Sequence, residues 1–121
     1  GRRALILLSD GDDRYSATSA TDLLAFAREK DVLIYPIAIG KRRPAVFAEL
    51  ASVSGGRSFQ ATTAGALAAA LATIARELRV QYLIGYAPAV SGSDRPGLRS
   101  IRVKVRRAGV SVRGRDGYVA K

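Results

Sequence analysis

Two continuous apolar segments constrain the fold of this 121-residue chain most strongly. The first is Ala4–Leu8 and the second is Val32–Ile39, and each has the length of a strand. Continuous apolar runs of this kind are typical of parallel strands that are buried on both faces of a sheet. A stretch of helical length lies between them. The sequence therefore predicts a β-α-β unit in which the two strands run parallel.

The stretch between these strands has the start signal of a helix. Ser19 can cap the amino end, and Asp22 follows three residues later as in a capping box. We expect this helix to end near Lys30. Its buried face should comprise residues at the spacing i, i+3, i+4 and i+7, namely Ala20, Leu23, Leu24 and Ala27.

The alternation of strands and helices continues to Arg79. Pro36 cannot donate a ladder hydrogen bond, so we expect its strand to lie at an edge or to pair irregularly. Pro44 predicts the first turn of a second helix, Gly55 predicts its end, and the apolar face should comprise Phe47, Leu50 and Ala51. After a short third strand over 57–61, a third helix should begin at the cap Thr63 and bury a stripe of Leu67, Leu71, Ile74 and Leu78.

Beyond Arg79 the pattern changes to one of antiparallel strands. Residues 80–86 predict a strand, 87–97 a loop rich in Pro, Gly and Ser, and 98–107 a strand in which valines alternate with cations. A turn at Ala108–Gly109 should lead into a last strand over 110–113. The predicted fold class is therefore a parallel α/β half-sheet with three helices over 1–79, followed by an antiparallel β-hairpin extension over 80–121.

Composition excludes several classes of site. The chain has no cysteine and no histidine, which excludes disulfides, thiolate metal sites, His-based zinc hydrolysis and Ser-His-Asp or Cys-His catalysis within these residues. No apolar run approaches the roughly 20 residues that a membrane-spanning helix needs. The net charge is +10, of which residues 76–121 contribute +8. A solvated basic face is the ordinary interpretation of such a tail, and a nucleic-acid partner is the alternative.

The strongest candidate for chemistry is the loop after the first strand, in the segment LILLSDGDD at Leu5–Asp13. Open α/β sheets bind ligands at the carboxyl ends of their strands, and a carboxylate placed there can hold a hard cation. Asp10 is the candidate ligand, and Gly11 permits the sharp turn. Asp12 and Asp13 extend the acidic loop. Turn chemistry alone is the alternative explanation for an Asp-Gly pair in this position.

Several segments, in order, resemble the second half of a von Willebrand factor type A (vWA) domain. They are LILLSDGDD, KDVLIYPIAIG at 30–40 and ELASVSGGRSF at 49–59. The segments IARELRVQYLIGYAP at 74–88, LRSIRVKVRR at 98–107 and GRDGYVA at 114–120 are more particular and resemble the bacterial, acidobacterial-type VWFA-related family. This resemblance implies a Rossmann-like parallel sheet, with 1–79 as the carboxyl-terminal part of a vWA domain that begins further upstream. It also suggests an exported or cell-envelope bacterial protein.

The resemblance further implies part of a metal-ion-dependent adhesion site. In vWA domains this site combines an Asp-x-Ser-x-Ser loop, a Thr and the Asp of a Ser/Thr-Asp-Gly loop. Only the last element maps onto this sequence, as Ser9, Asp10 and Gly11, and no Asp-x-Ser-x-Ser string is present. A hard cation prefers about six oxygen ligands, so we expect no tight binding of Mg²⁺ or another divalent cation by these residues alone. The full-length parent would supply the remaining ligands.

The leading functional hypothesis is a non-enzymatic module that binds a protein ligand. One alternative is a basic nucleic-acid-binding domain, in which Tyr82 and Tyr86 stack bases near the cations of 102–106. A second alternative is a phosphatase of the haloacid-dehalogenase type, with Asp10 as nucleophile and Asp12 as acid/base. Arg14 stands where that family usually has Thr or Val, and the Ser-Asp-Gly context suits the vWA interpretation better.

Overall fold

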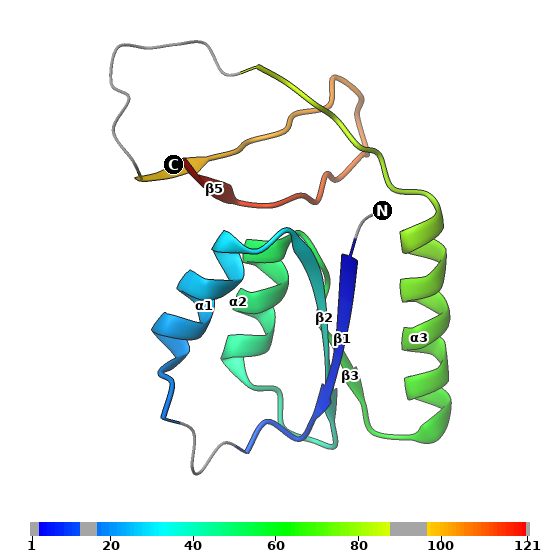
Figure 1. The fold of residues 1–121 in the computed structure, drawn as a ribbon. Coiled ribbons are helices and arrows are strands. Elements are labelled where there is room, and N and C mark those ends of the chain that lie inside the picture. The colour runs from blue at the N-terminus through cyan, green and yellow to red at the C-terminus, as the bar shows by residue number, and fades with distance from the viewer. Residues whose placement is uncertain (1–2, 13–16, 88–96, 121) are drawn as a thin grey trace.

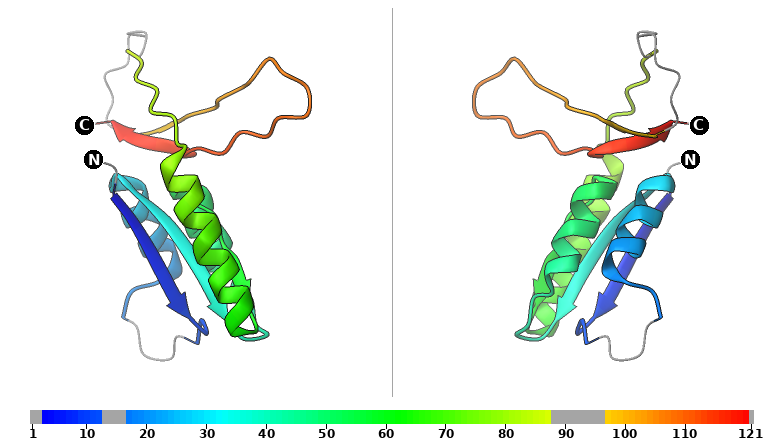
Figure 2. Two further views of the ribbon diagram at one scale, coloured as in Figure 1. Left: turned by 90° about the vertical axis from the view of Figure 1, so that its right-hand side faces the viewer. Right: turned by 90° about the vertical axis from the view of Figure 1, so that its left-hand side faces the viewer.

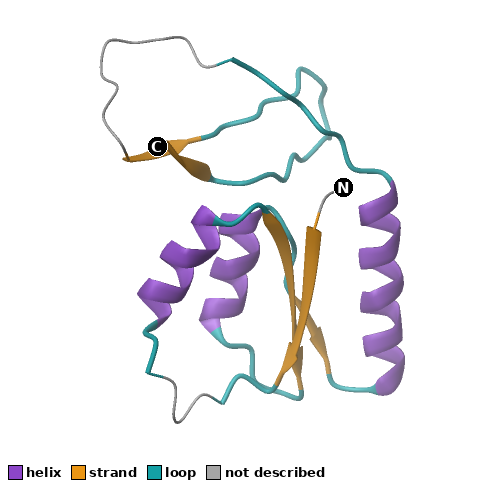
Figure 3. Cartoon of the chain, in the orientation of Figure 1, coloured by secondary structure: helices purple, strands orange, loops and turns teal. Residues whose placement is uncertain are grey.

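The computed structural model describes residues 3–12, 17–87 and 97–120. Over these residues three helices pack around a three-stranded parallel sheet, and a two-stranded antiparallel sheet follows them (Figures 1 and 3). The predicted parallel α/β half-sheet with three helices is thereby confirmed, as is the antiparallel pairing after Arg79. The two sheets lie at different levels of the molecule, with the antiparallel pair across one end of the parallel sheet.

The parallel sheet has the order β1-β2-β3, with β1 at Arg3–Ser9, β2 at Val32–Ile39 and β3 at Phe59–Ala61. Helices α1 (Ala20–Glu29) and α2 (Ala45–Ser54) cover one face, and α3 (Ala64–Arg79) covers the other (Figure 1). All three strands point the same way, so their carboxyl ends form one edge and the helices end at the opposite edge.

Each helix begins or ends at a residue that the sequence marks. The Ser19 side chain accepts a hydrogen bond from the Asp22 amide at the start of α1, and Thr63 accepts one from Ala66 at the start of α3. Gly55 ends α2 in the left-handed region with φ of +83°, a conformation that glycine adopts without steric cost. The apolar face predicted for α2 is buried in full.

Pro36 lies in the middle strand of the described sheet, so the expectation of an edge strand is wrong. The alternative of irregular pairing holds, because β2 pairs with β3 only from Ile37 onward. The amide of Ile34, two residues before the proline, points away from β1 and donates to Ser54 Oγ at 3.0 Å. By the two-residue alternation of a strand, the Pro36 nitrogen points to the same side, one residue before that pairing begins. The missing donor therefore leaves no ladder acceptor unpaired.

Ser54 provides a test of this arrangement. Its buried hydroxyl accepts from the Ile34 amide and donates to the Ala51 carbonyl at 3.2 Å. Ser54→Ala leaves a buried amide without a partner, and we expect it to lower the free energy of unfolding by about 1–3 kcal/mol in urea denaturation. Ser52→Ala, on the exposed side of the same helix, should change it by less than about 0.5 kcal/mol. Equal effects of the two substitutions would contradict the buried hydrogen bond.

The burial predicted for two helical faces is only partly correct. In α1 only Ala27 is buried, and Leu23 is exposed. In α3 Ile74 is buried, but Leu71 and Leu78 are each 37% exposed, so the predicted continuous stripe is wrong. The reason is that α3 packs over β2 and β3, which leaves the side of the helix nearer β1 uncovered. Strand β1 is likewise exposed at Leu5, Ile6 and Leu8.

The region after α3 departs furthest from the sequence prediction. Residues 80–87 form no strand, and the antiparallel pair consists of β4 (Gly97–Ser100) and β5 (Gly117–Ala120) rather than 98–107 and 110–113. The turn at Ala108–Gly109 is present, with φ of +74° at Gly109. Most of the loop expected over 87–97 lies outside the described residues.

Candidate functional site

Three loops meet at the carboxyl edge of the parallel sheet. They follow β1 at Ser9–Asp12, β2 at Gly40–Pro44 and β3 at Thr62–Thr63. The register brings Ser9 beside Ala38 and Ile39 beside Ala61, so the strands end close to one another. The structure therefore places Asp10 at the carboxyl end of a strand, as the sequence predicts.

The Asp10 loop is held by local hydrogen bonds and by a close backbone approach. The Gly11 amide donates to Ser9 Oγ at 3.0 Å, and the Asp12 amide donates to Asp10 Oδ1 at 3.1 Å. Gly11 has φ of +78°, and a Cβ built on it would lie 1.9 Å from Cγ of Pro44. Any side chain at position 11 would thus be strained and would displace the loop after β2. The glycine fixes where the exposed Asp10 carboxylate stands.

A second contact ties the same two loops together. Arg42 donates to the carboxylate of Asp12 and forms an ion pair with it. Gln60 Nε2, from β3, donates to the carbonyl oxygens of Gly40 and Lys41 at 3.0 and 2.9 Å. The sequence alone does not pair Arg42 with Asp12 or Gln60 with the loop after β2, because no local pattern links residues 19 to 30 positions apart. Asp13 lies outside the described residues.

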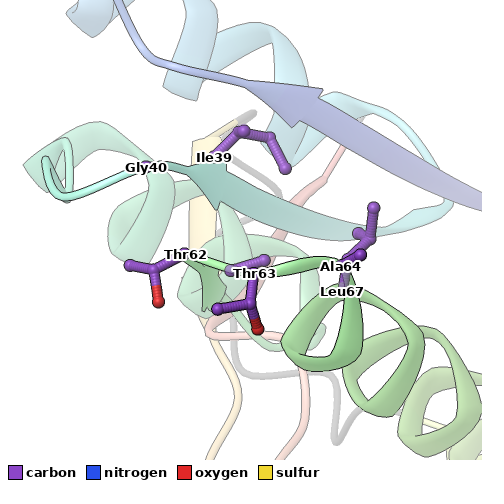
Figure 4. Close-up of a pocket in the computed structure, with 7 residues that line it drawn as sticks. Ile39, Gly40, Thr62, Thr63, Ala64 and Leu67 are labelled. Carbon is purple, nitrogen blue, oxygen red and sulfur yellow. The ribbon is translucent and has the colours of Figure 1, made fainter.

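A shallow pocket opens beside these loops, between the ends of β2 and β3 and the start of α3 (Figure 4). Its volume is about 280 Å³, and it is lined by Ile39, Gly40, Ala61, Thr62, Thr63, Ala64 and Leu67. Thr63 uses its hydroxyl to cap α3. None of the described residues that line it has an ionisable side chain. The pocket is therefore a mainly apolar recess next to the Asp10 loop.

The described carboxylates at this edge are Asp10 and Asp12, which are too few to form a metal centre by themselves. Within 3–12, 17–87 and 97–120, no three Asp or Glu side chains come together where they could hold a metal ion. Asp10 Oδ1 accepts from the Asp12 amide, and the Asp12 carboxylate is engaged with Arg42. The single carboxylate of Asp10 supplies fewer oxygen ligands than the roughly six that Mg²⁺ prefers. Among the described residues, Asp10 is therefore the exposed carboxylate at this edge that the Arg42 ion pair does not engage, and the strength of its metal binding stays a prediction.

The tyrosines considered for base stacking lie at the other end of the molecule. Tyr82 is 87% exposed and Tyr86 is 59% exposed, but no strand places them on a common face. Loss of solvation raises the pKa of the Tyr86 phenol above its ordinary value of 10.0, and the neighbouring Tyr118 raises it further. Tyr118 lies opposite Arg99 in the β4–β5 pair. The 80–87 segment therefore ends beside the antiparallel pair.

Comparison with known proteins establishes the fold and no more. No family model matches the sequence, and no curated protein matches it. A crystal structure of an uncharacterized membrane-spanning protein from Vibrio fischeri is similar, with a TM-score of 0.57 and 23% sequence identity. The match covers 63% of this chain and 47% of that protein, so the shared region is about half of the Vibrio protein. At this identity the likeness concerns the α/β arrangement alone.

None of the helices in the described ranges has the length and the apolar character that crossing a membrane requires.

Proposed function

We propose that this chain is a non-enzymatic protein-binding module of the vWA type, and that the Ser9-Asp10-Gly11 loop forms part of its contact surface. The observation that carries the proposal is the position of Asp10, an exposed carboxylate at the end of β1. Asp10 lies at the edge of the sheet at which open α/β folds bind their ligands. Gly11, Pro44 and Arg42 hold the surrounding loops in place.

The proposal includes a metal ion only for a longer parent protein. A bound divalent cation would link Asp10 to an acidic side chain of the protein ligand, and residues outside this chain would supply the other oxygens. On this proposal residues 1–79 are the later part of the vWA domain, and 80–121 extend it.

The two alternative functions receive less support from the geometry. A phosphatase needs the second carboxylate free to transfer a proton, whereas Asp12 is paired with Arg42. Base stacking needs aromatic rings beside a cationic track, and the described structure does not align Tyr82 and Tyr86 on one strand.

Metal titration tests the proposal. Residues 1–121 should bind Mg²⁺ or Mn²⁺ weakly in calorimetry, whereas a chain that continues upstream in the same gene should bind tightly and lose that binding on Asp10→Ala. Tight binding by residues 1–121 that Asp10→Ala abolishes would reveal further ligands among them. Equal, weak binding by both chains would contradict the adhesion-site assignment and leave Asp10 as a turn residue.

A further inference from the structure

The antiparallel pair at the far end of the molecule stops abruptly. Strands β4 and β5 pair from Gly97↔Ala120 to Ser100↔Gly117, and the Ile101 amide donates to the Asp116 carbonyl at 2.8 Å. The same register, continued, would close on a two-residue turn at Ala108–Gly109, where the structure does have a turn. In the described structure, however, no backbone–backbone hydrogen bond joins 102–106 to 110–113.

Charge explains why the pairing stops at Ile101. The continued register would place Lys104 opposite Arg113 and Arg102 opposite Arg115. Like charges directly opposite each other destabilise an antiparallel pair. The interruption therefore follows from the sequence of the two strands.

The segment that precedes β5 is instead held by the helices that pack on the parallel sheet. Arg113 forms an ion pair with Glu77, in the last turn of α3, at 2.7 Å. Arg115 donates to the carbonyl oxygens of Arg28 and Lys30 at 2.8 and 2.9 Å, at the end of α1. These carbonyls form the negative end of a helix, which favours a cation.

A backbone contact completes this attachment. A Cβ built on Gly55, which ends α2, would lie 2.9 Å from the backbone of Gly114 and of Arg115. The segment 113–116 thus crosses the carboxyl ends of all three helices, as Figure 1 shows for its position above them. Held in this way, it is not free to pair with 102–106.

The segment 102–106 is therefore left without a backbone partner on the side that would face 111–115. Its sequence from 102 to 106 is RVKVR, in which Val103 and Val105 are 45% and 49% exposed and the three cations are also exposed. No ion pair involves these cations within the described part of the chain. Residues 97–115 contain seven basic residues and no acidic one. Figure 2 shows residues 102–112, which we call the arm, projecting beyond the helices.

We propose that residues 102–106 form a strand-addition site for an extended peptide in which acidic residues alternate with aliphatic ones. Such a strand supplies backbone partners for the unpaired amides and carbonyls, acidic side chains opposite Arg102, Lys104 and Arg106, and aliphatic side chains beside Val103 and Val105. An anionic membrane would cover the valines and the cations and leave the backbone unpaired. A nucleic acid would neutralise the cations alone. The peptide strand accounts for all three features.

This site is distinct from the one proposed at Asp10. Residues 102–106 lie at the edge where the helices end, and Asp10 lies at the edge where the strands end (Figure 1). The two sites can therefore be tested separately, because Asp10→Ala should leave peptide binding at 102–106 unchanged.

The experiment is a fluorescence anisotropy titration with a short labelled peptide in which Glu and Val strictly alternate. We expect it to bind at least about tenfold more tightly than a peptide of the same composition with its Glu and Val residues in separate blocks. Hydrogen exchange at the amides of 102–106 should slow by at least about tenfold when the alternating peptide is bound. This exchange measurement uses the unmodified protein and does not depend on any variant.

Charge reversal provides the matched comparison. Arg102→Glu combined with Lys104→Glu should weaken binding of the alternating peptide at least about tenfold, and a Lys-Val alternating peptide should bind this variant instead. Lys41→Glu combined with Arg43→Glu makes the same change in net charge at the opposite edge and should have no such effect.

Three results would overturn the proposal. Equal affinity for the alternating and the blocked peptide would show attraction by net charge alone. Protection of amides outside 102–106 by the bound peptide would place the site elsewhere. Protection of 102–106 by oligothymidylate or by phosphatidylglycerol vesicles, but not by the peptide, would assign the arm to nucleic acid or to a membrane surface.

Discussion

Replacement of Gly56 by alanine is expected to lower the free energy of unfolding by about 3 kcal/mol or more. Gly56 is buried against the middle strand, and a Cβ built on it would lie 1.9 Å from the carbonyl oxygen of Ile34 and 2.8 Å from its carbonyl carbon. Both contacts are with backbone, so no side chain can rotate to relieve them. Strand β2 would have to move away from the end of α2, and urea denaturation measures the cost.

Gly65 provides the control for this substitution. It lies in the first turn of α3, where the nearest atom to a built Cβ is Thr63 Oγ1 at 3.9 Å. Alanine favours a helix over glycine by about 0.5–1 kcal/mol, so Gly65→Ala should stabilise the protein slightly. A tolerated Gly56→Ala, with the same denaturation midpoint as the unmodified protein, would show that the turn at 54–56 does not pack on Ile34.

The elements that the sequence predicts well are those whose signals are local. The apolar run at Val32–Ile39 coincides with β2, and Ser19 and Thr63 cap the helices that follow them. A capping side chain bonds to an amide three residues away, and an apolar run marks burial wherever its neighbours lie. Neither signal requires knowledge of the tertiary fold.

The elements that the sequence predicts poorly depend on distant neighbours. Residues 80–86 form a strand only if another strand pairs with them, and no described strand does so. Alternation at 102–106 favours a strand in the same way, but the segment that would pair with it carries like charges and is bound to the helix ends. Since both outcomes depend on a partner remote in the sequence, local pattern could not decide them.

The candidate site shows the same division. The position of Asp10 follows from strand β1, which ends at Ser9, one residue beyond the apolar run Ala4–Leu8 from which the sequence predicts it. The pairing of Arg42 with Asp12 and the contact of Pro44 with Gly11 join loops that different strands carry to one edge. Such contacts follow from the order of strands in the sheet, and the order is a tertiary property.

The second large effect on stability is expected at Ile74, because the apolar residues of α3 are unequally buried. Ile74 is 1% exposed and packs in the cluster with Tyr35, Ile37, Ala61 and Ala70. Ile74→Ala removes buried methyl groups and leaves a cavity between α3 and the sheet, and we expect it to cost about 2–5 kcal/mol of unfolding free energy. The measurement is the midpoint of urea denaturation. It reports stability when the slope m, the dependence of the unfolding free energy on urea concentration, is the same in both proteins.

Leu71 tests whether the cost follows burial or merely the apolar pattern of the helix. It lies three residues before Ile74 in the predicted stripe, yet it is 37% exposed. Leu71→Ala should therefore cost about 1 kcal/mol or less, since part of its surface is already in water and alanine is the better helix former. Equal costs for the two substitutions would show that α3 buries both residues. The helix would then lie closer to β1, which would cover the side of the sheet that carries Ile6 and Leu8.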